Sequence, residues 1–522
     1  MLGTRRSVRV SLAIVAVVVC ADCFVLREGV MAEKVPLGVA IDNMAPQDVW
    51  QRFYDVTQIP RRSEHEENIR VYLVQFGTGL GLETIVDTAG NVIIRKPAAP
   101  GMENRKGVIL QSHMDMVADQ TPETVHDWEN DPIAAYVEDD WVKAEGTTLG
   151  ADDGIGMALA MGILQSRTIA AGPLEALFTV DEEAGMTGAK GLAPGVLTGD
   201  ILINLDGELD GEFTIGCAGG EAGDVRAGYV ETAFPRGMSS YRFTVGGLKG
   251  GHSGTEINLG HGNAAKLLIR FLKDGAARYG LRVAEIDSGT AANAIPRDGT
   301  ALVCIPAGKD NDFLAHVAEY AAILKSELGA VETELSVTAA AADRPHRIMS
   351  EHAQRTFVNA FYGTPQGVIR MSDNVADLVE TSTNMGVARA RDRVLECSNR
   401  LRSSVDTAID DVANTLSSVW ELAGAEVVYS GRYPGWKPNP GSPIVLLMSD
   451  VYRALFATDP SVVAIHAGLE CGTIYGTYPN LDMISVGPTT EKVHSPSERL
   501  YVPSVQRTMD LLAETLNRIP VK

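Results

Sequence analysis

The sequence predicts an α/β fold in which a mostly parallel sheet, flanked by helices, is interrupted by an inserted α+β domain. Near-continuous apolar runs at residues 107–111, 174–180 and 201–205 are typical of strands that helices cover on both faces. After about residue 220 the pattern changes, and residues 241–245 alternate like a half-exposed strand. At 522 residues, the chain also exceeds one ordinary domain of about 150 residues.

The first part of the interrupted domain, residues 42–219, alternates helices and strands. Its expected helices are residues 49–56, 66–76 and 154–165. Besides the three apolar runs, its expected strands are residues 84–86 and 91–95, around a turn at 87–90. The last of these helices lies between two apolar runs, which is the order of a parallel strand–helix–strand unit.

The inserted domain is expected at residues 220–432, with the strand at 241–245 and helices at 263–273 and 312–328. Residues 433–441 are rich in proline and glycine, break the periodicity and indicate a connection. The first domain then resumes at residues 433–522, where helices at 445–456 and 504–516 flank a strand at 483–486. The sequence shows no internal repeat.

The charge balance argues against some classes of partner. The chain has 45 Lys and Arg against 67 Asp and Glu, a net charge of −22. Nucleic-acid and polybasic membrane-surface proteins need a basic face, so neither class is expected. Most of the surplus acid should be solvated surface, although a few carboxylates could surround cations. Four cysteines stand far apart without a Cys-x-x-Cys pair and are expected to be buried: Cys217, Cys304, Cys397 and Cys471.

The N-terminal residues 1–32 have two interpretations. Three arginines precede an uncharged run at 10–21, which is too short to cross a bilayer but fits the apolar core of a signal peptide. A cleaved signal peptide would place the protein in the periplasm or outside the cell. Alternatively, translation starts at Met31 and the protein is cytoplasmic. Neither interpretation leaves an integral membrane span in the mature chain.

Ionisable residues follow the predicted strands and precede a predicted helix. They are His113 and Asp115, Asp152 and Asp153 in a glycine-rich turn, Asp181-Glu182-Glu183, Asp206, and His494. Each alone has an ordinary explanation, such as a surface pair or a helix cap. Because ligands collect beyond the carboxyl ends of parallel strands, we expect these side chains to lie together.

Two imidazoles and three carboxylates of this set suit zinc, cobalt or manganese, which accept nitrogen and oxygen ligands together. The five are His113, Asp152, Glu183, Asp206 and His494. Five ligands exceed one tetrahedral site, whereas two cations roughly 3.5–4 Å apart that share a carboxylate account for them. A water between such cations becomes acidic, and a carboxylate that is not a ligand could take its proton.

Four motifs resemble those of the M20 clan of metallopeptidases: QSHMDMV at 111–117, GTTLGADDGIG at 146–156, DEEAGMTG at 181–188 and HSP at 494–496. Longer phrases are similar to the aminoacyl-histidine dipeptidase branch, the cytosol non-specific dipeptidase group: CAGG at 217–220, GGHSG at 250–254, YPGW at 433–436 and HAGLECG at 466–472. The resemblance covers about residue 42 to the C-terminus. It implies a di-metal catalytic domain with the inserted domain as its lid.

The resemblance also implies roles for the matching positions. Two zinc ions per subunit would be held, one completed by His113 and Asp206 and the other by Glu183 and His494. Asp152 would bridge them, through a cis peptide bond to Asp153. Cobalt or manganese stays open as the metal, because Asp153 stands where relatives often carry Asn.

Catalysis would need two further carboxylates, with Glu182 as general base and Asp115 orienting His113. The lid would supply His252 for the oxyanion, assisted by Asn293, and Arg402 for the substrate carboxylate, with His466 as a further substrate contact. From the residues alone, the loop of His252 could be only a turn and Arg402 only an ion-pair partner.

The resemblance predicts a dipeptidase that hydrolyses unblocked dipeptides, Xaa-His among them. An M20 aminoacylase or longer-peptide exopeptidase stays open as a second hypothesis, and a non-catalytic metal- or peptide-binding protein as a third. The chain has no Gly-x-Ser-x-Gly elbow at a strand-to-helix turn, so a serine hydrolase is not predicted. The resemblance leaves a homodimer open, since no residue pattern marks an interface.

Overall fold

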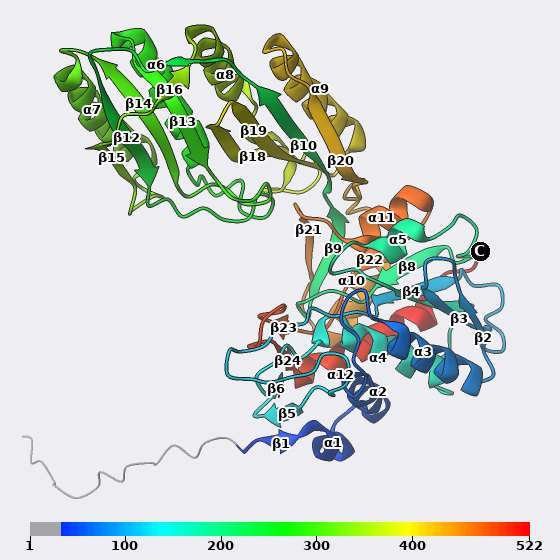
Figure 1. Ribbon diagram of the computed structural model, residues 1–522. Coiled ribbons are helices and arrows are strands. Elements are labelled where there is room, and N and C mark those ends of the chain that lie inside the picture. Colours follow the sequence, from blue (N-terminus) through cyan, green and yellow to red (C-terminus); the bar gives the residue numbers. More distant parts are fainter. Residues whose placement is uncertain (1–32) are drawn as a thin grey trace, which may run out of the picture.

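The computed structural model describes residues 33–522 and shows two layered units joined by two chain crossings (Figure 1). One unit is built on an eight-stranded sheet and the other on a nine-stranded sheet. The predicted leader, residues 1–32, lies outside the described residues. None of the described helices has the length and apolar character needed to span a membrane. The predicted fold class is confirmed.

The eight-stranded sheet holds the strands predicted from apolar runs at its centre. Its spatial order is β2 (Glu83–Val86), β3 (Val92–Lys96), β7 (Leu174–Thr179), β4 (Val108–His113), β8 (Ile201–Asn204), β22 (Asp482–Ser485), β9 (Glu212–Cys217) and β21 (Ser461–Ile465). The run from β7 to β22 is parallel, whereas β3 and β9 are antiparallel to their inner neighbours. β4, β7 and β8 are buried along their whole length, which explains their unbroken apolar sequences.

Helices cover both faces of this sheet. The larger group is α2 (Gln47–Thr57), α4 (Ala151–Gln165), α10 (Pro443–Phe456) and α12 (Val502–Arg518). The opposite face is covered by α5 (Thr187–Gly191) and α11 (Glu470–Thr477), and α3 (Glu67–Gly79) packs beside β2 and β3. Leu110 belongs to the larger apolar cluster and Ile109 to the smaller one, because successive side chains of a strand point to opposite faces.

A small five-stranded sheet, which the sequence did not predict, supports the loop of His494. Its spatial order is β1 (Val35–Pro36), β5 (Ala135–Glu138), β6 (Trp141–Ala144), β24 (Arg499–Tyr501) and β23 (Thr490–Glu491). A short helix α1 (Leu37–Ala40) and a 3-10 turn (Ile41–Asn43) follow β1. His494 lies between β23 and β24, so this sheet determines where the imidazole points.

The nine-stranded sheet consists of two halves with the same topology. The first half is β12 (Met238–Gly246), α6 (Ala264–Tyr279), β13 (Arg282–Ser288), β14 (Gly299–Pro306), α7 (Asp310–Leu328) and β15 (Ser336–Ala341). The second is β10 (Gly219–Gly228), α8 (Glu351–Gly363), β18 (Val379–Arg391), β19 (Val394–Ser403), α9 (Asp406–Leu422) and β20 (Val427–Tyr433). Each is a βαββαβ unit, and the two meet where β13 pairs antiparallel with β18.

The repeated topology was not visible in the sequence. Both halves have the same strand order, read outward from the junction, and the first half is inserted between β10 and α8 of the second. A short β17 (Gly367–Met371) pairs with β18, and β11 (Glu231–Ala233) pairs with β16 (Arg347–Met349). Two similar folds require similar patterns of burial rather than similar residues, so a sequence repeat is not needed.

The chain crosses between the two units beside Cys217 and Trp436. These residues exchange two backbone hydrogen bonds, 2.9 Å from Cys217 N to Trp436 O and 3.0 Å from Trp436 N to Cys217 O. A side chain at Gly219 would clash with the backbone of Gly435, so the crossings need glycine to approach so closely. We propose these crossings as domain boundaries, in line with the predicted ranges 42–219, 220–432 and 433–522.

Two further sequence predictions can be compared with the structure. All the predicted helices are present, most of them longer by a few residues. Cys217, Cys304, Cys397 and Cys471 are buried and unpaired with one another, as predicted.

Candidate active site

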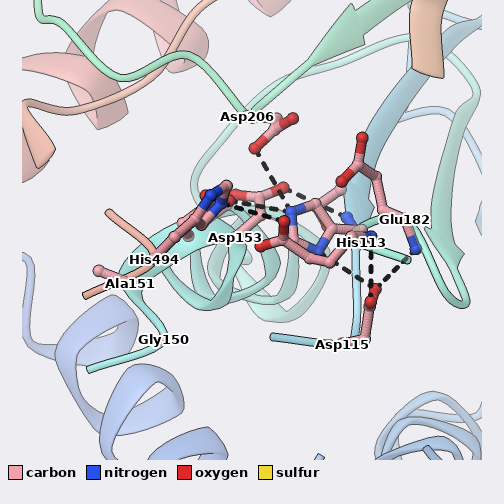
Figure 2. A network of polar contacts seen from close by, with 12 residues as sticks. His113, Asp115, Gly150, Ala151, Asp153, Glu182, Asp206 and His494 are labelled. Atoms are coloured by element: carbon pink, nitrogen blue, oxygen red, sulfur yellow. Dashed lines mark hydrogen bonds and ion pairs between the residues drawn. The ribbon is translucent and has the colours of Figure 1, made fainter. Parts of the chain in front are cut away.

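A cluster of imidazoles and carboxylates lies beyond the carboxyl ends of the central parallel strands (Figure 2). His113 is the last residue of β4, Glu182 and Glu183 follow β7, and Asp206 follows β8. Asp152 comes from the first turn of α4, which begins after β6. The parallel arrangement therefore brings residues that are distant in the sequence to one edge of the sheet.

Asp152 lies at the centre of this cluster and faces both imidazoles. Its Oδ1 lies 2.9 Å from His113 Nε2, and its Oδ2 lies 3.0 Å from His494 Nε2. His113 Nε2 is also 3.5 Å from Asp206 Oδ1, and His494 Nε2 is 3.0 Å from Glu183 Oε2. The five residues predicted as metal ligands thus form two groups that share the Asp152 carboxylate.

The position of Asp152 is set by a buried carboxylate that the sequence did not single out, Glu498. Its Oε2 accepts hydrogen bonds from the amides of Leu149 and Gly150, at 2.8 and 2.9 Å. Its Oε1 accepts from the amides of Ala151 and Asp152, at 2.7 and 3.2 Å. The peptide bond between Asp152 and Asp153 is cis, as the resemblance implied.

Asp115 is completely buried behind His113 and contacts two functional segments at once. Its Oδ1 lies 3.3 Å from His113 Nδ1 and accepts the amide of Glu182 at 3.0 Å. Its Oδ2 accepts the amide of Glu183 at 3.2 Å and the hydroxyl of Ser63 at 2.8 Å. One side chain therefore orients the imidazole and the turn that carries both glutamates.

A buried arginine, Arg61, ties together the backbone around the cluster. Its guanidinium donates to the carbonyls of Met114 and Asp115, which follow β4, and of Gly150, which precedes α4. Burial lowers the pKa of Arg61, and nearby carboxylates, Asp115 first, oppose that shift. Neither Arg61 nor Ser63 carries a spacing signal in the sequence, because each acts through a contact with a distant segment.

The electrostatics of the cluster favour bound cations. Burial raises the pKa values of Glu182 and Asp206 well above their usual range, and neighbouring carboxylates add to the shift. Hydrogen bonds that the imidazole donates to the carboxylates of Asp152 and Glu183 raise the pKa of His494 to about 11. Oε1 of Glu183 is buried and has no hydrogen-bond partner among the described residues. The residues present therefore fit a metal centre, since cations would neutralise the carboxylates and use the unpartnered oxygen.

A further buried carboxyl group lies under the cluster, on the other face of the sheet. Oε2 of Glu470, in α11, accepts from Gln111 Nε2 at 2.7 Å and from Thr179 Oγ1 at 2.6 Å. Burial raises the pKa of Glu470 to about 7. Asn204 Nδ2 donates to Gln111 Oε1 at 2.6 Å, so one polar network links β8, β4 and β7 beneath their functional ends.

Three of the predicted substrate-binding residues form a separate cluster. Arg402, on β19, has Nη2 3.4 Å from His252 Nε2 and donates from Nη1 to the hydroxyl of Tyr433 at 3.1 Å. His466 Nε2 lies 2.7 Å from the hydroxyl of Ser382, on β18. Burial, with the charge of Arg402 next, lowers the pKa of His466 to about 3, so this imidazole is neutral.

These residues are brought together by Gly254, which follows the His252 loop. A side chain there would clash with the His466 carbonyl and lie 3.1 Å from both Arg402 Nε and His252 Cε1. The fourth predicted residue, Asn293, is exposed, and its backbone carbonyl accepts the amide of Ser253 at 2.9 Å. Within residues 33–522, no hydrogen bond or ion pair joins this cluster to the metal-ligand candidates.

Comparisons with known proteins agree with this arrangement. The sequence model of peptidase family M20/M25/M40 matches residues 109–518. A cytosol non-specific dipeptidase of Escherichia coli is 43% identical over 482 residues, covering 92% of this chain and 99% of the relative. The structure of aminoacylhistidine dipeptidase from Vibrio alginolyticus has a TM-score of 0.89 and 43% identity, covering 92% of this chain and 98% of that one.

A more distant structure has the same fold. A tripeptidase from Staphylococcus aureus has a TM-score of 0.51 at 16% identity, covering 91% of this chain and 99% of that chain. The resemblance first suggested by short motifs therefore extends over almost the whole described chain. This chain belongs to peptidase family M20/M25/M40.

Proposed function

We propose that this chain is a metal-dependent dipeptidase that hydrolyses unblocked dipeptides, Xaa-His among them. The observation that carries the proposal is Asp152, whose two carboxylate oxygens face His113 and His494 at 2.9 and 3.0 Å. Such a shared carboxylate is what a pair of cations requires. The names of two relatives at 43% identity, both dipeptidases, support the reaction class.

Two zinc ions are the proposed cofactors, with cobalt or manganese as substitutes. His113, Asp152 and Asp206 would hold one ion, and Asp152, Glu183 and His494 the other. When bound, the cations would acidify a water molecule and polarise the scissile carbonyl. Nitrogen and oxygen donors in this mixture suit metals of intermediate softness.

Glu182 is the proposed general base. Burial raises its pKa well above the usual range. A carboxylate that is not itself a metal ligand could accept a proton from water and pass it to the leaving amine. Its backbone amide is held by Asp115, which also orients His113. Arg402 would hold the substrate carboxylate and His252 the oxyanion, with Asn293 and His466 as further contacts.

The test combines metal analysis with a substrate panel. Chelated protein should lose hydrolysis of Ala-His and Ala-Leu and recover it with zinc. Retained hydrolysis after chelation would contradict the proposal. Glu182→Gln should still bind two metal ions per chain but not turn over, which separates the dipeptidase from a non-catalytic metal- or peptide-binding protein.

An aminoacylase or a longer-peptide exopeptidase is the alternative on the same scaffold. Dipeptides, tripeptides and N-acyl amino acids should be assayed side by side with the zinc-loaded enzyme. Dipeptides are expected to be hydrolysed fastest, because Arg402 would hold a free carboxylate at a defined distance from the metals. Faster hydrolysis of the acyl compounds or tripeptides would favour the alternative.

Location and assembly are part of the proposal. The E. coli relative is named for the cytosol, which supports a cytoplasmic protein translated from Met31 rather than export through a signal peptide. N-terminal sequencing of protein from the native host tests this choice. Sedimentation analysis tests whether the chain forms the homodimer that the resemblance left open.

A further inference from the structure

A hollow of about 370 Å³ lies between the two units, and Gly254 and His466 are among its lining residues. Its lid side is formed by Val375, Leu378 and Val379, and its other side by Val462, Val463 and Ile465 of β21. We call it the valine hollow. Within residues 33–522, β21 is the last strand of the eight-stranded sheet and pairs only with β9, and its residues 462–465 line the hollow.

The valine hollow is lined mainly by accessible apolar side chains, together with the polar side chains of Thr255, Asn258 and Asp377. Val462 is 36% exposed, and Val463 and Ile465 are half-buried. Among the residues that line the hollow, Asp377 is the one carboxylate, and its side chain is exposed. A group of accessible branched side chains next to a polar cluster is typical of a binding site for an apolar group.

The hollow shares two of its lining residues, Gly254 and His466, with the proposed substrate cluster. A Cβ atom added to Gly254 would lie 3.1 Å from Arg402 Nε. That nitrogen is buried and has no hydrogen-bond partner among the described residues. The guanidinium therefore lies next to Gly254, a lining residue of the hollow, with a donor still to be used.

The covalent geometry of an amino acid connects these two features. The carboxylate carbon and Cβ of a C-terminal residue are bonded to the same Cα and lie about 2.5 Å apart. If Arg402 holds the carboxylate, the side chain of that residue must lie within a few ångströms of the guanidinium. The valine hollow is the apolar space that adjoins this position.

We propose that the valine hollow binds the side chain of the C-terminal residue of the substrate and favours uncharged over charged side chains there. This inference rests on the proposed dipeptidase function and specifies its substrate class. An apolar side chain would displace water from the valines, whereas a charged one would lose part of its hydration against them. The N-terminal residue is not selected by this hollow.

The test compares Ala-Gly, Ala-Leu, Ala-Asp and Ala-Lys with zinc-loaded wild type and with Val462→Asp. Wild type should prefer Ala-Leu over Ala-Asp in kcat/KM by at least about tenfold, the discrimination that an apolar pocket achieves. Val462→Asp should lower kcat/KM for Ala-Leu about tenfold and leave Ala-Gly within about twofold. It should also raise the use of Ala-Lys relative to Ala-Leu.

The matched control is Val428→Asp. Val428 is 62% exposed on β20, the edge strand of the other sheet, and does not line the hollow. This variant should keep the wild-type preference. Leu378→Asp, on the lid side, should repeat the selective loss seen with Val462→Asp.

The outcomes separate the two proposals. If wild type hydrolyses the dipeptides but shows no preference at the C-terminal residue, the valine hollow is not the subsite. The same conclusion follows if Val462→Asp lowers Ala-Gly and Ala-Leu equally. If zinc-loaded wild type hydrolyses no dipeptide, including Ala-Gly, the proposed function fails and this inference fails with it.

Discussion

The two polar clusters of this protein are built in different ways. The metal-ligand candidates come from the ends of neighbouring strands in one sheet, and their contacts are short, from 2.9 to 3.5 Å. The substrate cluster draws His252 from one half of the lid, Arg402 from the other and His466 from the catalytic unit. The first can be complete in one unit alone, whereas the second exists only when three segments meet. Removing a side chain from one cluster should therefore change other measured quantities than removing a side chain from the other cluster.

The largest effect is expected for Glu182→Gln, at the metal cluster. The amide has the same shape but cannot accept a proton, so kcat should fall about 10³-fold, within the usual range for a lost general base. Bound metal, measured by elemental analysis, should be unchanged. If the variant retains more than a tenth of the wild-type kcat, another residue is the general base.

A smaller effect, about 100-fold in kcat/KM, is expected for Arg402→Ala in the substrate cluster, since a charge-assisted hydrogen bond to a carboxylate is lost. The loss should lie mainly in KM. Dipeptide amides, which lack the carboxylate, should be hydrolysed equally by wild type and variant. An equal loss on the amides would show that Arg402 supports the structure rather than the substrate.

Asp115→Asn should reduce zinc affinity about tenfold, because the partner that orients His113 is weakened while the ligand remains. Competition with a fluorescent chelator measures this affinity. Excess zinc should restore most of the activity, which distinguishes a positioning residue from the base. Arg402→Ala, in the other cluster, is the control and should bind zinc like wild type.

The smallest effect on activity is expected for Glu470→Gln, which retains an acceptor for Gln111 and Thr179. Burial raises the pKa of Glu470 to about 7, so the folded metal-free protein binds this proton more tightly than the unfolded chain does. The contribution to stability is therefore present at low pH and is lost as the pH rises from about 4.3 to about 7.

Urea unfolding of chelated protein at pH 5 and pH 8 tests this linkage. From pH 5 to pH 8, the free energy of unfolding of wild type should fall by on the order of 2 kcal/mol more than that of Glu470→Gln. An equal change in the free energy of unfolding of both proteins would show that Glu470 is already ionised at pH 5 in the folded state. With either result, the variant measures what the polar network of Glu470, Gln111 and Thr179 contributes to stability.

The sequence predicted the positions of the metal-ligand candidates better than the residues that support them. His113, Glu183 and Asp206 follow strands that read as apolar runs, so the rule for parallel sheets placed them at one edge. Glu498 acts through four backbone amides on a loop more than 300 residues earlier, and no spacing or periodicity records such a contact. Arg61 and Ser63 escaped prediction for the same reason.

The substrate cluster could be proposed only through the family resemblance. His252, Arg402 and His466 meet because two lid halves and the catalytic unit come together, and local patterns carry no information about that packing. The small sheet around His494 was also missed, since its strands are two to four residues long. The doubled lid left no repeat in the sequence because burial patterns, not residues, are shared.

The pairing of β13 with β18 has a consequence for how the lid behaves in dilute solution. Both halves of the lid belong to one polypeptide, and they contribute His252 and Arg402, respectively, to the substrate cluster. Their meeting is an intramolecular event, so its probability does not fall as the protein concentration falls. A cell that contains only a few copies of this chain would hold each of them with the His252–Arg402 contact already assembled.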